Sequence, residues 1–191
     1  MEHIQDLLRA GQIAEAIRET ETKLGLLPSS DFHGVIGKDL LHLQPALTSF
    51  LNHFYTDMKE EEELDMKAMY IEMNSFTIQY DRWFLHVLGY ESLSDRDNLD
   101  WLTDFSGESE KSLVITGYEA LQEANKKYMQ SEGYRNDDLR QACELQELLV
   151  ILRVQELVSH TVTAGKGKFP WADLPVFVAA HDYEDLMFIT K

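Results

Sequence analysis

The sequence is poor in cysteine, in basic residues and in long apolar runs, and each shortage excludes a class of protein. The single cysteine, Cys143, permits no internal disulfide, so a disulfide-stapled secreted scaffold is excluded. Seventeen Lys and Arg stand against 34 Asp and Glu, a net charge of −17 that opposes contact with a nucleic-acid backbone. No stretch approaches the roughly 18 apolar residues that mark a spanning helix. We therefore expect partners that are neither nucleic acids nor membranes.

Proline and glycine are also scarce, which leaves no room for a low-complexity linker. The chain has four prolines and ten glycines, and 44% of its residues are hydrophobic, the composition of an ordinary globular protein. Its 191 residues suffice for one core, so we expect a single domain over 1–191. The first ten residues include Glu2 and Asp6 and lack the pattern of a signal peptide, so we expect a cytoplasmic location.

Two apolar stripes in residues 2–28 predict a helical hairpin, interrupted by a glycine and followed by a proline. The stripes and their flanking residues are Ile4, Leu7, Leu8, Gly11, Ile13, Ala16, Ile17, Leu24 and Pro28. Through Gly11, Ala16, Ile17, Leu24 and Pro28 the segment resembles one tetratricopeptide-type unit, which implies two helices that cross closely at Ala16. Repeat arrays need about three units for a continuous core, and no second copy follows, so a solenoid is not expected.

Residues 38–59 carry an amphipathic helical pattern that contains Pro45. A proline inside a helix either kinks it or marks the first turn of a new one, because its nitrogen has no hydrogen to donate. An acidic run, Glu60 to Glu63, follows and opposes the helix dipole, so we expect the acidic run to end the helix and the chain to fray at Glu61 to Glu63. The segment 1–62 is thus the helical N-terminal part of the domain.

Aromatic and β-branched residues gather at 68–90 and 175–190, which predicts strands. We expect three strands in the first segment, one of them over 76–78, and a hairpin in the second. About five strands would then form one antiparallel sheet packed by helices, the longest at 137–162. The prediction is an α+β fold in which 66–191 contains the sheet.

Residues suited to catalysis are scattered and lie in no recognised motif. Cys143 has one basic neighbour within a helical turn, Arg140, so nothing marks its thiol as activated. Glu72 and Asp81 are the acid–base candidates beside apolar strands, although strand alternation places Glu72 toward solvent. The Gly-Lys-Gly-Lys run at 165–168 lacks the frame of a phosphate-binding loop. We therefore assign no catalytic residue, no metal ligand and no cofactor.

Two alternatives stay open. His181, Asp182 and Glu184, with His86 as a distant partner, offer imidazole and oxygen ligands for a metal-dependent hydrolase; the same acids would equally cap a solvated turn. A small-ligand pocket lined by Met69, Phe76, Trp83 and Phe84 is the other alternative, and ordinary core packing explains those residues as well.

The leading hypothesis is an acidic, cytoplasmic protein-binding domain, an inhibitor or immunity-type protein that neutralises a basic effector. Trp83, Trp101 and Trp171 exceed what a core of this size must hold, and aromatic anchors beside steering carboxylates suit a protein interface. The candidate contact residues are Asp57, Glu60, Glu61, Glu62, Glu63, Asp95, Asp97, Asp100, Trp101 and Asp104.

Overall fold

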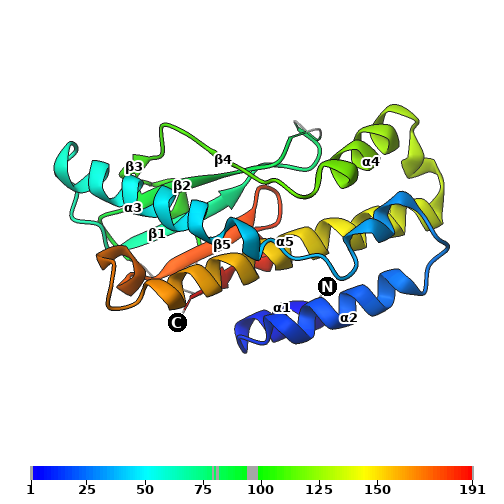
Figure 1. Ribbon diagram of the computed structural model, residues 1–191, viewed down its shortest axis with the longest axis horizontal. Coiled ribbons are helices and arrows are strands. Elements are labelled where there is room, and N and C mark those ends of the chain that lie inside the picture. The colour runs from blue at the N-terminus through cyan, green and yellow to red at the C-terminus, as the bar shows by residue number, and fades with distance from the viewer. Residues whose placement is uncertain (1, 79, 81, 94–98, 191) are drawn as a thin grey trace.

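Helices and one sheet pack together in a computed structural model that describes residues 2–78, 80, 82–93 and 99–190 (Figure 1). The helices are α1 (Glu2–Arg9), α2 (Ile13–Gly25), α3 (Gln44–Glu60), α4 (Glu119–Gln130) and α5 (Asp137–Gly165). The strands are β1 (Ala68–Met73), β2 (Phe84–Tyr90), β3 (Gly107–Glu108), β4 (Leu113–Val114), β5 (Val176–Ala180) and β6 (Phe188–Ile189). The predicted α+β fold is confirmed.

The N-terminal hairpin consists of α1 and α2, as predicted. Gly11 joins them with a φ of 74°, a left-handed conformation that favours glycine. Ala16 is fully buried, and α2 packs along α5. One hydrophobic cluster contains side chains of this hairpin together with those of the sheet.

The helix expected over 38–59 begins later than its amphipathic pattern. A 3-10 turn at Leu41–Leu43 precedes α3, which starts at Gln44 and has Pro45 in its first turn. The missing N–H of a proline costs nothing there, because the first amides of a helix have no partner within it. The helix ends at Glu60, and Glu63 adopts a φ of 55°, so the expected helix end at the acidic run is confirmed.

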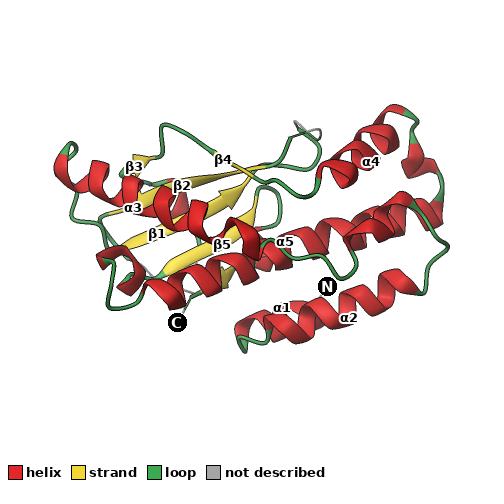
Figure 2. Ribbon diagram, in the orientation of Figure 1, coloured by secondary structure: helices red, strands yellow, loops and turns green. Residues whose placement is uncertain are grey.

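The sheet has the order β3-β2-β1-β5-β6, with β4 also paired to β2. The pairs β1–β2 and β5–β6 are antiparallel, whereas β1 and β5 are parallel with Met73 opposite Ala180. The wholly antiparallel sheet that we expected is therefore wrong in this one pairing. Parallel strands need a long connection, and α5 lies in the segment that returns the chain to the sheet (Figure 2).

The strand expected over 76–78 does not form. Asn74 closes the loop after β1 instead: its side-chain carbonyl accepts from the Phe84 amide at 2.8 Å, and its amide donates to the Arg82 carbonyl at 3.2 Å. Phe76 is buried and meets Trp83 edge-on at 5.3 Å between ring centroids. The apolar residue that favoured a strand thus fills the core from a loop.

The two faces of the sheet are covered differently. Helices α3 and α5 cover one face, where Trp83 and Trp171 are fully buried, so these two tryptophans are not available as interface anchors. The second face bears a smaller cluster beneath Trp101. The strand residues of the first face are Met69, Ile71, Met73, Leu85, Val87, Val176, Val178 and Ala180; those of the second include Ala68, Tyr70, Leu88, Tyr90, Phe177 and Ala179.

The longest helix, α5, spans 29 residues, about 43 Å. Asn136 caps it by accepting from the Leu139 amide at 3.0 Å. It contacts α2, α3 and β5, and buried residues lie on most of its sides, which explains why it lacks a single apolar face. Within the described part of the chain, no helix has both the length and the apolar character needed to cross a membrane.

A half-buried carboxylate on α5 holds the turn that follows β5. Tyr183 donates its hydroxyl to Glu147 at 2.6 Å, and the Cys143 thiol donates to the same carboxylate at 3.5 Å. Burial raises the pKa of Glu147 above its ordinary 4.5, although both hydrogen bonds act in the opposite direction. The contact fixes the turn that carries His181 and Glu184.

Replacing Glu147 with Gln should raise the melting temperature at neutral pH. Because burial raises the folded-state pKa, wild type loses stability as the pH rises from the ordinary carboxyl value through the folded-state value. Glutamine still accepts from Tyr183 and carries no charge. We expect a gain of roughly 2–4 °C at neutral pH that vanishes in acid, measured by thermal unfolding across pH. The exposed Glu123 on α4 provides the control, Glu123→Gln. A gain that does not depend on pH would contradict this account.

Candidate functional site

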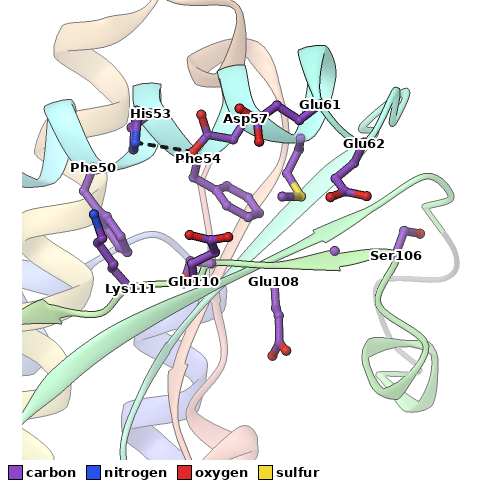
Figure 3. A pocket seen from close by; sticks show the side chains of 13 residues that line it. Phe50, His53, Phe54, Asp57, Glu61, Glu62, Ser106, Glu108, Glu110 and Lys111 are labelled. Carbon is purple, nitrogen blue, oxygen red and sulfur yellow. Dashed lines mark ion pairs between the residues drawn. The ribbon is translucent and has the colours of Figure 1, made fainter.

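A groove of about 420 Å³ lies between the C-terminal half of α3 and the segment 106–111 (Figure 3). We call it the acidic groove. Its lining combines apolar side chains with several carboxylates. The residues that line it are Phe50, His53, Phe54, Asp57, Met58, Glu61, Glu62, Ser106, Gly107, Glu108, Ser109, Glu110 and Lys111.

The floor of the acidic groove depends on a close approach between α3 and the sheet. Phe54 and Met58 are buried. Phe54 points from α3 toward the strands (Figure 3), and the Met58 sulfur lies beside Gly107 of β3. A Cβ at Gly107 would clash with the Met58 side chain, and a Cβ at Gly89 would lie 3.2 Å from the Phe54 ring. The two glycines therefore allow the helix to lie close to the sheet, with an apolar floor between them.

The rim of the acidic groove is negatively charged. Asp57, Glu61 and Glu62 project from α3 and its end, and Glu110 lies across the gap from them (Figure 3). His53 pairs with Asp57 at 3.4 Å, one helical turn apart. Lys111 is the one Lys or Arg among the lining residues. The arrangement offers carboxylates around an apolar floor, which suits a cationic group carried on an apolar stem.

The structure gathers part of the predicted contact set. Asp57, Glu61 and Glu62 line the groove together, while Glu60 and Glu63 are exposed in the same run and are not part of its lining. Asp95 and Asp97 lie outside the described residues. No sequence pattern marks the segment 106–111, which completes the groove, because its one short strand, β3, spans two residues and is too short to show an alternation of apolar and polar residues.

Trp101 does not join these carboxylates. It lies in a 3-10 turn, Asp100–Thr103, and packs edge-on against Tyr90 at 4.9 Å and Phe177 at 5.3 Å between ring centroids. Both partners belong to the sheet face opposite α3. The ring therefore packs on the second face of the sheet and does not face the acidic groove. Asp100 and Asp104 are exposed on this same segment.

A smaller hollow, about 220 Å³, lies on the second face of the sheet. Its lining includes Glu72 of β1, His86 of β2 and His181 after β5. Glu72 is directly opposite His86 in the antiparallel register, and His181 follows Ala180, which is paired with Met73. We call it the sheet-face hollow.

Three potential metal ligands meet at this hollow. His181 Nδ1 lies 3.2 Å from Glu72 Oε1, and one ligand atom each of Glu72, His181 and Glu184 lie within 4.8 Å of one another. The hydrogen bond to Glu72 raises the pKa of His181 above its ordinary 6.5, partial burial opposes the shift, and the carboxylates of Asp182 and Glu184 reinforce it.

Sequence reasoning found two of these three ligands. His181 and Glu184 come together as expected, but the Asp182 carboxylate accepts from the Ser75 hydroxyl at 3.0 Å, and Glu72 takes the third position. Glu72 is half-exposed, as strand alternation predicted. Its place beside His181 follows from the parallel pairing of β1 and β5, which no local pattern reveals.

The small-ligand pocket considered from the sequence is not formed by its four residues. Met69, Phe76 and Trp83 are buried in the core beneath the helices. Phe84 lies on the other face, where it lines the sheet-face hollow and meets His86 edge-on at 5.0 Å. Asp81 lies outside the described residues. Cys143 is buried, and burial raises its pKa, which suits a structural thiol.

Comparison of the chain with protein-family models, with curated proteins and with solved structures finds no match. The geometry of the acidic groove and of the sheet-face hollow is therefore the basis for a functional proposal.

Replacing Trp101 with Ala should destabilise the fold, because the ring packs against Tyr90 and Phe177. We expect a loss of about 2–3 kcal/mol in the free energy of unfolding, measured with chemical denaturant. Phe105, 45% exposed and nearby, is the control, and Phe105→Ala should change the same free energy by less than about 0.5 kcal/mol. Equal free energies of unfolding for the two variants would show that the packing of Trp101 against the sheet does not stabilise the fold.

Proposed function

We propose that the protein is an acidic, cytoplasmic protein-binding domain that neutralises a basic effector, as an inhibitor or immunity-type protein does. The observation that carries the proposal is the acidic groove, in which Asp57, Glu61 and Glu62 surround an apolar floor. Three residues selected from the sequence as contacts are thus part of one concave surface.

Charge and shape both favour a segment of a basic protein as the occupant. The groove carboxylates would attract Lys or Arg side chains, and the net charge of −17 would steer a basic partner toward the molecule. The stems of Lys and Arg are apolar, so they match the floor formed by Phe54 and Met58. A nucleic acid would need a basic surface for its phosphates, which this groove does not offer.

The test uses two double variants that change the same charge. Glu61→Lys with Glu62→Lys alters the lining of the groove, whereas Glu60→Lys with Glu63→Lys alters the same acidic run outside it. The wild-type protein is first used to capture a basic protein from source lysate at low salt, and the captured protein is released at about 0.5 M salt. Its affinity for wild type and for each double variant is then measured by titration. We expect the groove variant to weaken binding at least roughly tenfold and the control to weaken it much less.

Two results would contradict the proposal. If no basic protein is captured from the lysate, the protein has no partner of the proposed kind. Equal loss of affinity in both double variants would show that net charge, and not the groove, holds the partner. Circular dichroism of each variant checks that the fold is retained, which is expected because all four glutamates are exposed.

A further inference from the structure

The sheet-face hollow lies apart from the acidic groove, on the opposite face of the sheet, and its ligand chemistry is different. Strand alternation separates the two faces: Ile71 and Met73 pack beneath the helices, and Glu72 between them points the other way. A ligand bound in this hollow would not depend on the proposed binding of a basic partner.

We propose that Glu72, His181 and Glu184 bind one divalent transition-metal ion of the zinc class at the edge of the sheet-face hollow. Of the described residues, these three form the group whose His and carboxylate ligand atoms all approach within 4.8 Å. The separation of His181 Nδ1 and Glu72 Oε1, 3.2 Å, is close to the about 3.3 Å between neighbouring ligand atoms of a tetrahedral zinc ion.

The structure positions each ligand through a separate element. Glu72 belongs to a central strand, and Tyr70 donates its hydroxyl to the Glu72 carboxylate at 3.4 Å. His181 is held because its amide donates to the Met73 carbonyl at 2.9 Å. The turn bearing Glu184 is tied to α5 through Tyr183 and Glu147. Such outer contacts orient metal ligands and strengthen binding.

The ligand types select the class of ion. Calcium takes six to eight oxygen ligands and magnesium favours oxygen ligands with several retained waters, whereas zinc accepts one imidazole with two carboxylates. Three protein ligands leave a fourth position open, and the hollow that Glu72 and His181 line extends to His86. The His86 imidazole makes no side-chain hydrogen bond within the part of the chain that the structure describes, and it meets the Phe84 ring edge-on. Its imidazole is therefore available to the ion or to a molecule bound beside it.

The experiment measures zinc binding directly. Chelator-treated protein is titrated with Zn²⁺ by calorimetry, and the ion retained after gel filtration is measured by elemental analysis. We expect about one equivalent in wild type and an affinity lower by roughly tenfold or more in His181→Ala and in Glu72→Gln. Zinc should also raise the melting temperature of wild type, and much less that of the two variants.

The matched control is His53→Ala, which removes an exposed imidazole that also pairs with a carboxylate, Asp57 at 3.4 Å, but lies on α3. Its zinc affinity should equal that of wild type. Absence of stoichiometric zinc in wild type, equal affinity in His181→Ala, or an equal loss in His53→Ala would overturn the proposal. Tighter binding of Mg²⁺ or Ca²⁺ than of Zn²⁺ would overturn the choice of ion.

Discussion

The parallel pairing of β1 with β5 is the contact on which the rest of the structure depends. It joins the middle of the chain to its C-terminal part, with Met69 to Met73 in register with Val176 to Ala180. Both strands are almost wholly buried, because α3 and α5 cover one face of the sheet and a smaller cluster, with Trp101 packed against it, lies on the other. The same pairing places His181 beside Glu72, so the candidate metal site is a direct product of the strand order.

The unequal covering of the sheet separates the two candidate sites. On the helical side, two glycines allow α3 to approach the sheet, and the carboxylates at its end surround an apolar floor. On the other side, no helix of the described chain lies over Glu72, His86 and His181, so polar residues of the strands remain open to solvent. In the acidic groove, the carboxylates are close together in the sequence because they lie at the end of one helix. In the sheet-face hollow, the pairing of strands brings together ligands from distant parts of the chain.

Local patterns predicted the N-terminal helical hairpin, the helices α3 and α5, the C-terminal strand hairpin and the α+β class, because each depends on periodicity within a short window. Local patterns gave wrong or incomplete predictions where contacts between residues distant in the sequence determine the structure. Phe76 has the character of a strand residue, but the Asn74 side chain closes a loop around it by bonding to Phe84 and Arg82. Trp101 is the type of residue that often anchors an interface, but its ring packs edge-on against Tyr90 and Phe177 of the sheet. Strand alternation identified Glu72 as half-exposed. It could not identify Glu72 as a neighbour of His181, because the residue pattern of neither strand specifies the register between β1 and β5.

For the proposed binding of a basic partner, the distribution of charge on the chain requires that the partner also match the shape of the groove. Acidic residues are spread over the whole chain, and at physiological ionic strength the Debye length is about 8 Å, so carboxylates farther than this from a bound cation contribute little. In the proposed complex the net charge of −17 would thus act mainly on the rate of encounter. Affinity must come from carboxylates that surround a bound segment and from apolar surface that the segment removes from water. The end of α3 supplies both, because Glu61 and Glu62 lie beside Phe54 and Met58.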